Sequence, residues 1–119
     1  MRFIDSRTHA VIDYMSGILF IASPWVLGFA NHGAAMSLPS ITGALIIIIS
    51  LMTDFEYGLL PAVSLPMHLH FDIIIGLVLL TSPWIFGFSA RVMWPHVIFG
   101  MVSVFAGLFT EKQIRPALF

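Results

Sequence analysis

Two histidine–aspartate pairs have the residue types and spacing that could carry chemistry in this chain. His9 lies four positions before Asp13, and His68 lies four positions before Asp72. Residues at i and i+4 share one face of an α-helix, so the members of each pair are predicted to be neighbours. Three interpretations stay open: a structural hydrogen-bond network, a proton or ion site built on the imidazoles, and a site for a divalent metal or a haem.

The composition predicts that the helices positioning these pairs cross a membrane. Of the 119 residues, 59% are hydrophobic and 9% are charged, whereas an ordinary soluble domain has about 25% charged residues. So few ionisable side chains cannot cover the surface of a soluble domain. A net charge of −1 argues against a nucleic-acid partner. The lack of cysteine excludes a disulfide-stapled domain, a cysteine-based zinc finger and a thiol nucleophile.

The uncharged runs predict four spans. Residues 14–53 carry no charged side chain, and this run is long enough for two helices of about 20 residues each. A polar, glycine-containing turn at 30–33 divides it. We expect helices over 7–29, 37–53, 66–89 and 93–110. Ser6 is the expected N-cap of the first helix, and Pro39, Pro66 and Pro95 are expected in the first turns of the others. The first apolar segment is expected to be a retained span, not a cleaved signal peptide.

The basic residues predict the orientation. The side that holds both termini carries Arg2, Arg7, Lys112 and Arg115, and the other side carries Arg91. We therefore expect a multi-pass protein of the plasma (inner) membrane with both termini in the cytoplasm. Trp25, Trp84 and Trp94 then form an aromatic belt at the outer interface.

The chain contains an internal repeat. Both halves read His-x3-Asp-x3-Gly-x5-Ser-Pro-Trp-x2-Gly-Phe, with an offset of 59 residues. In the second helix of each half the offset is 57, which aligns Gly43 with Gly100 and Thr53-Asp54 with Thr110-Glu111. We expect a single membrane domain over 1–119, with repeat 1 over about 7–54 and repeat 2 over about 66–111.

The two copies of Ser-Pro-Trp, at residues 23–25 and 82–84, carry a resemblance to a known family. The chain resembles the SPW repeat family of small integral membrane proteins. The resemblance implies two tandem helical hairpins, and it supplies no catalytic residues. Together with the spans, it predicts an all-α, four-helix transmembrane bundle. Because each repeat has an even number of spans, the hairpins should be related by a pseudo-twofold axis along the membrane normal.

The repeated residues suggest how the helices pack. Small residues let membrane helices approach closely, so Gly17 and Gly76 are predicted to mark a contact between the first and third helices. Gly43 and Gly100 are further packing candidates. That contact would bring His9, Asp13, His68 and Asp72 together on the pseudo-axis, as a carboxylate within a span usually faces the interior.

The Ser-Pro-Trp motif is predicted to be structural. Pro24 and Pro83 should kink or loosen their helices, and the hydroxyls of Ser23 and Ser82 should satisfy an orphaned carbonyl. Trp25 and Trp84 are predicted to anchor the outer interface. A gating hinge, or a wall for a quinone-like ligand, is the alternative. His96 is expected at the interface.

The predicted function is a non-enzymatic accessory or assembly module, since no nucleophile–base pair, phosphate loop or dinucleotide fingerprint is present. The alternative is a protein that handles a cofactor, metal or protons through the duplicated His-x3-Asp site. A small oligomeric transporter or channel is a further alternative. The expected partners are the lipid bilayer and a protein partner or a second copy, without nucleic acid; haem and a divalent metal are the cofactors considered.

Overall fold

The protein consists of four helices. The computed structural model describes residues 1–31 and 33–114, and within them the helices are α1 (Ser6–Val26), α2 (Ala34–Leu51), α3 (Leu65–Ile85) and α4 (Trp94–Phe109). These described residues contain isolated β-bridges but no β-strand. The predicted all-α class is confirmed.

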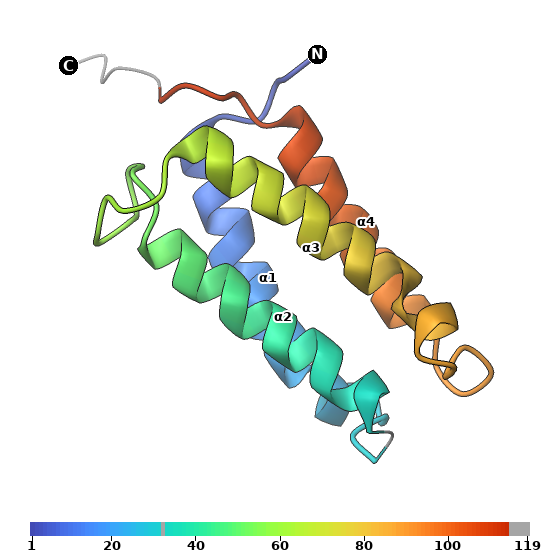
Figure 1. Ribbon diagram of the computed structural model, residues 1–119. Helices are drawn as coiled ribbons and strands as arrows, with labels where there is room; N and C mark the ends of the chain where they lie inside the picture. The colour runs from blue at the N-terminus through green and yellow to red at the C-terminus, as the bar shows by residue number, and fades with distance from the viewer. Residues whose placement is uncertain (32, 115–119) are drawn as a thin grey trace.

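The helices form two hairpins that lie side by side (Figure 1). In each hairpin the two helices are closely packed, α1 along α2 and α3 along α4, whereas fewer contacts join α2 to α3 and fewer still join α1 to α4. The turns within the hairpins lie at one end, which we call the outer end. The N-terminal segment, the connection between α2 and α3 and the last turn of α4 lie at the opposite end, the inner end. There the Phe3 amide donates to the Phe109 carbonyl at 2.9 Å, and the Glu111 amide donates to the Ile4 carbonyl at 2.8 Å.

Pairs of glycines set the close packing within each hairpin. A Cβ added at Gly100 would lie 2.6 Å from the carbonyl oxygen of Gly76, and one added at Gly17 would lie 3.0 Å from that of Gly43. The predicted glycine contact between the first and third helices is therefore wrong. Each glycine of α1 or α3 faces the glycine of its own hairpin, because a small residue marks a close approach without specifying the partner helix. The two hairpins make equivalent contacts, and the pseudo-twofold axis stays a prediction.

The helix ends differ from those predicted at one serine and one proline. The N-cap of α1 is Asp5, whose side chain accepts from the Thr8 amide at 2.8 Å, and Ser6 is the first helical residue. Pro39 lies inside α2 and not in its first turn, because α2 begins earlier than expected, at Ala34. Pro66 and Pro95 do occupy the first turns of α3 and α4.

In the Ser-Pro part of the motif, the serine replaces a backbone hydrogen bond that the proline cannot make. Pro24 has no N–H, so it leaves the carbonyl of Phe20 without its helical donor. The hydroxyl of Ser23 donates to that carbonyl at 2.8 Å. In α3 the hydroxyl of Ser82 donates in the same way to the Leu79 carbonyl at 2.7 Å. Each helix consequently continues for two more residues beyond its proline.

The Gly-Phe part of the motif ends the helix. Gly28 and Gly87 have φ values of 79° and 75°, a conformation that glycine adopts at little cost. This turn lets the Phe29 amide donate to the Pro24 carbonyl at 2.8 Å, and the same bond at 2.9 Å ends α3. Both are the 6→1 bonds of a Schellman motif, so the repeated sequence encodes a helix stop.

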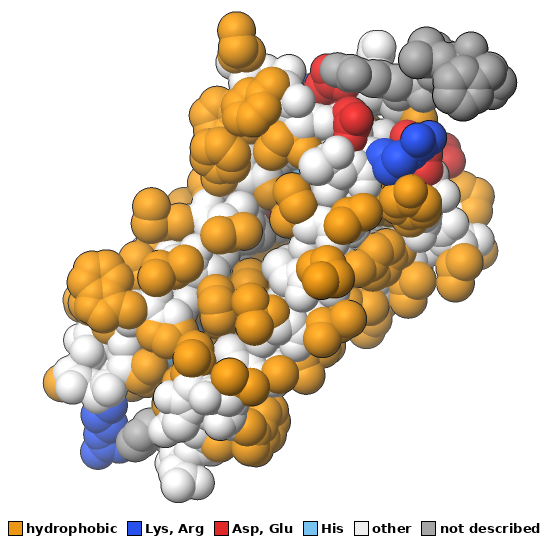
Figure 2. Space-filling model, turned by 180° about the vertical axis from the view of Figure 1, so that it is seen from behind, with side chains coloured by type: hydrophobic (Ala, Val, Ile, Leu, Met, Phe, Trp, Pro, Cys, Tyr) orange, Lys and Arg blue, Asp and Glu red, His pale blue; other side chains and the backbone are white. Residues whose placement is uncertain are grey.

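Apolar side chains fill the centre and also cover much of the outside. One core cluster takes Phe20, Ile46, Leu79 and Phe99 from the four helices, and the rings of Phe20 and Phe99 stack at 4.3 Å. The face shown in Figure 2 is largely hydrophobic along its sides, with charged side chains gathered at its ends. In the part of the chain that the structure describes, α2 and α3 are long and apolar enough to cross a membrane, and α4 is a shorter apolar helix.

Candidate metal centre

The four residues of the duplicated pairs lie together inside the molecule, near its inner end. His9 and Asp13 come from α1, and His68 and Asp72 come from α3. None is more than 4% exposed. One nitrogen or oxygen atom of each residue lies within 4.8 Å of the others. The two helices meet through these polar side chains and not through glycines.

The shortest contacts in this cluster run between the hairpins. The Nε2 atom of His68 lies 2.6 Å from Oδ2 of Asp13, and that of His9 lies 2.7 Å from Oδ2 of Asp72. The contacts within each i, i+4 pair are longer, at 3.0 Å in α1 and 3.3 Å in α3. The two Nε2 atoms are 3.3 Å apart. The four atoms therefore surround one point shared by both hairpins.

Two threonines determine which nitrogen of each imidazole carries a proton. Nδ1 of His9 lies 2.7 Å from Oγ1 of Thr110, and Nδ1 of His68 lies 2.7 Å from Oγ1 of Thr53. Each hydroxyl donates its single proton to a backbone carbonyl of the preceding turn. The hydroxyl must then accept from the imidazole, so Nδ1 of each histidine carries the hydrogen. A neutral imidazole in this tautomer directs the lone pair of Nε2 towards the cluster.

The cluster consequently needs positive charge at its centre. Two carboxylate oxygens and two Nε2 lone pairs would repel one another in a site without bulk water. Either added protons or a metal cation could supply that charge. Among the described residues, Oδ2 of Asp72 is a buried side-chain oxygen without a hydrogen-bond partner. Its 2.7 Å contact with Nε2 of His9 is close but lacks hydrogen-bond direction. This oxygen can accept a proton or ligate a cation.

The donor set fits a divalent first-row metal. Two neutral imidazoles and two carboxylates balance the charge of one divalent ion, and this combination of nitrogen and oxygen suits zinc and its neighbours. Ligand atoms about 2.0–2.2 Å from a tetrahedral zinc ion are about 3.4 Å from one another. The distance between the two Nε2 atoms is already 3.3 Å. The two shortest His–Asp contacts would lengthen by about 0.7 Å.

A haem does not fit this geometry. Axial ligation by His9 and His68 would require a flat macrocycle between their Nε2 atoms. Those atoms are 3.3 Å apart, and both carboxylates occupy the same space. The arrangement can hold a single ion or protons.

The two carboxylates have different surroundings despite the repeat. The hydroxyl of Ser50 in α2 donates to Oδ2 of Asp13 at 3.0 Å. The matching position in α4 is Gly107, which has no side chain to offer Asp72. A Cβ at Gly107 would lie 2.7 Å from the Leu69 carbonyl, so close packing of α3 and α4 requires glycine there. Asp72 is thus left as the less satisfied of the two carboxylates.

The other residues singled out in the sequence lie away from the cluster. Trp25, Trp84 and Trp94 are exposed near the outer end. His96 is fully buried and not interfacial, so that prediction is wrong. Its Nε2–H donates to the Ala35 carbonyl at 2.7 Å, while Nδ1 is buried without a partner among the described residues. The rings of Phe29 and Phe88 pack beside it.

Sequence reasoning found the cluster but missed its supporting hydroxyls. Thr53, Thr110 and Ser50 hold the histidines and one carboxylate in place. The alignment of Thr53 with Thr110 was the available signal, since both occupy the same place after the second helix of a hairpin. Metal-binding histidines commonly donate their second ring N–H to a hydrogen-bond acceptor, and a threonine hydroxyl has that place here.

The chain is an all-α protein of two tandem helical hairpins with one buried His/Asp cluster between them. The chain belongs to the SPW repeat domain family, whose model matches residues 7–110. No curated protein and no solved structure matches the chain. The family and the apolar helices indicate a membrane protein, and neither assigns a biochemical role.

Proposed function

We propose that the protein is an integral membrane protein that binds one divalent transition-metal ion through His9, Asp13, His68 and Asp72. One observation carries the proposal. Four buried side chains place two Nε2 and two Oδ2 atoms within 4.8 Å of one another. Because Nδ1–H of each histidine donates to a threonine hydroxyl, the Nε2 lone pairs point towards the two carboxylates, and a divalent ion would balance their charge.

The membrane part of the proposal comprises four spans in the plasma (inner) membrane, with both termini in the cytoplasm. The hydrophobic outer surface supports it, because a bilayer would cover those side chains. The basic residues Arg2, Arg7 and Lys112 belong to the inner end and Arg91 to the outer turn of the second hairpin, which favours a cytoplasmic inner end. Arg115, which was counted with them, lies outside the described residues.

The role that fits a buried ion without a described nucleophile is binding and not catalysis. This agrees with the predicted accessory or assembly module, whose partner would be another protein or a second copy of the chain. The bound ion would then stabilise the folded module.

Proton handling is the second candidate function. The 2.6 Å bond between His68 and Asp13 suits an imidazolium–carboxylate pair, and the 2.7 Å ion-pair distance between His9 and Asp72 brings a second such pair within range. Two added protons would balance the cluster as well as one divalent ion does. The two candidates differ in whether the purified protein retains metal.

The test is metal analysis of the protein purified in mild detergent and reloaded with zinc or cobalt. We expect about one ion per chain, and Co²⁺ should give the intense visible absorption of a tetrahedral site. Asp72→Asn and His68→Ala should abolish both signals. His70→Ala is the matched control, because His70 is exposed on the same helix. Zinc contents equal in the protein and in Asp72→Asn would overturn the metal site and leave the proton site.

A further inference from the structure

We infer that the bound ion latches the two hairpins together at the inner end, so that metal occupancy regulates the seam between α1 and α4. The inference rests on the proposed metal site. It concerns what the ion does to the fold.

Each hairpin holds together without the cluster. The backbones of α1 and α2 meet at Gly17 and Gly43, and those of α3 and α4 meet at Gly76 and Gly100. A serine on α2, Ser40, adds a hydrogen bond to the Ile21 carbonyl of α1. The hairpins therefore behave as two preformed units, and any regulated movement lies between them.

The hydrogen bonds of the two histidines and the shortest His–Asp contacts of the cluster run from one hairpin to the other. His9, from the first hairpin, is held by Thr110 and Asp72 of the second. His68, from the second hairpin, is held by Thr53 and Asp13, which lie in the first half of the chain. An ion bound by all four ligands takes one imidazole and one carboxylate from each hairpin, so it cannot be bound without joining them.

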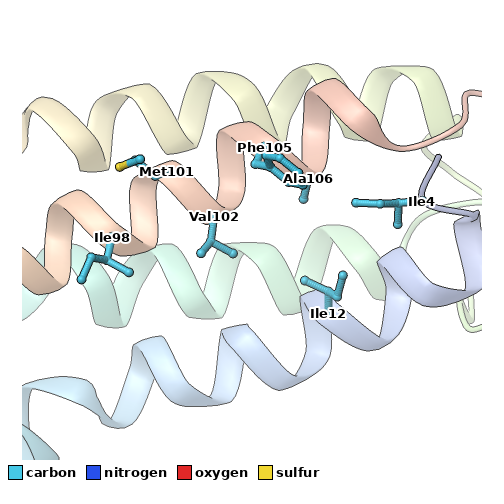
Figure 3. A pocket seen from close by; sticks show the side chains of 7 residues that line it. All are labelled: Ile4, Ile12, Ile98, Met101, Val102, Phe105 and Ala106. Carbon is cyan, nitrogen blue, oxygen red and sulfur yellow. The ribbon is translucent and has the colours of Figure 1, made fainter. Parts of the chain in front are cut away.

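The seam between α1 and α4 makes far fewer contacts than the helices make within each hairpin. An open apolar groove with a volume of about 400 Å³ runs along it. Figure 3 shows the side chains that line this groove. Its walls include Ile4 and Ile12 on one side and Ile98, Val102, Phe105 and Ala106 on the other. The groove adjoins the cluster, because Ile12 precedes Asp13 and the Ala106 carbonyl accepts the proton of Thr110.

Loss of the ion should open this seam from the inner end. Without the ion, the two carboxylates and two lone pairs repel one another unless the cluster takes up protons. Even with protons, two His–Asp contacts across the hairpins replace four bonds to one shared ion. Two features would hold the rest of the molecule. The stacked rings of Phe20 and Phe99 join α1 to α4 near the middle, and the bond from His96 to the Ala35 carbonyl joins α4 to α2 near the outer end.

A third link would limit how far the seam opens. The guanidinium of Arg2 donates to the carbonyls of Gly107 and Thr110, at 3.0 and 2.8 Å. Together with the backbone bonds from Phe3 to Phe109 and from Glu111 to Ile4, it ties the N-terminal segment to the end of α4. The expected movement is thus a limited separation of α1 from α4 near the ion, not a dissociation of the hairpins.

The experiment uses spin labels, which the lack of native cysteine makes straightforward. Val11 on α1 and Leu108 on α4 are exposed near the inner end, so Val11→Cys with Leu108→Cys reports across the seam. Met67→Cys with Leu108→Cys is the matched control within the second hairpin. Distance distributions are measured by double electron–electron resonance in lipid nanodiscs, with saturating zinc and after chelation, and bound zinc is measured in the same samples.

We expect chelation to lengthen and broaden the distances between positions 11 and 108, and to leave those between 67 and 108 unchanged. Asp72→Asn in the seam pair should abolish the response to zinc, and chelation of the unsubstituted cluster remains decisive if that variant does not fold. Zinc bound with no change across the seam would overturn the latch while the metal site stands. No bound zinc would overturn both.

Discussion

His9 and Thr110 are 101 residues apart in the chain, yet Nδ1 of the first lies 2.7 Å from Oγ1 of the second. The contact joins the beginning of α1 to the end of α4. It also fixes the tautomer of the imidazole, since the threonine proton is already used in a bond to a backbone carbonyl.

Thr110→Val should weaken metal binding by about 10–100-fold, because the imidazole loses the partner that orients it. Thr53→Val should have the same effect through His68. The measurement is a zinc titration by competition with a chromophoric chelator. Thr81→Val is the control, since the hydroxyl of Thr81 also bonds a carbonyl one turn back but holds no histidine. Equal affinities for all three variants would contradict the assigned tautomers.

Ser50→Ala should destabilise the protein by about 1–3 kcal/mol, because it removes the hydroxyl donor to the buried carboxylate of Asp13. Ser103→Ala removes a bond to the backbone carbonyl of Asp72, a neutral acceptor, and should cost about 1 kcal/mol. Denaturant unfolding in detergent micelles, monitored by tryptophan fluorescence, compares the two free energies. A larger loss for Ser103→Ala would show that the Asp13 carboxylate does not depend on this donor.

Ser23→Ala and Pro24→Ala should be strongly non-additive. Ser23→Ala alone leaves the Phe20 carbonyl buried without a donor and should cost about 1–3 kcal/mol. Once Pro24 is alanine, its N–H can donate to that carbonyl, so the serine becomes dispensable. A double-mutant cycle measures the coupling. Additive free energies would mean that the hydroxyl does not compensate for the proline.

Gly100→Ala should destabilise the second hairpin by about 1–3 kcal/mol, because the added methyl group would collide with the backbone of α3. Gly43→Ala should act in the same way on the first hairpin. Thermal unfolding compares each variant with Ile41→Ala, which truncates an exposed side chain on α2. A glycine variant as stable as the unsubstituted protein would show that the helices can move apart without cost.

The sequence predicted the cluster because duplication carries positional information. Asp13 and Asp72 have the same place in two copies of a motif, and a charged residue in an apolar helix normally faces the interior. Their meeting was predicted correctly, although the glycine contact that was expected to bring the two helices together lies within each hairpin instead. The helix count followed from the uncharged runs in the same way.

The sequence could not predict which helices pack against each other. Gly17 signals that another helix approaches closely, but the signal is the same whether the neighbour is α2 or α3. The burial of His96 depends on Phe29 and Phe88, which arrive from two different turns. The loss of symmetry at the carboxylates depends on the single difference between Ser50 and Gly107, which has meaning only when the contacts are known.

Each hairpin supplies one histidine and one aspartate to the cluster, and this division has a consequence for biosynthesis. A chain with only its first hairpin in place presents His9 and Asp13 without Thr110 or Asp72. The last member of the cluster, Thr110, follows the final helix. If the centre binds an ion as proposed, complete ligation requires both hairpins to be folded against each other, so occupancy would report that they have paired.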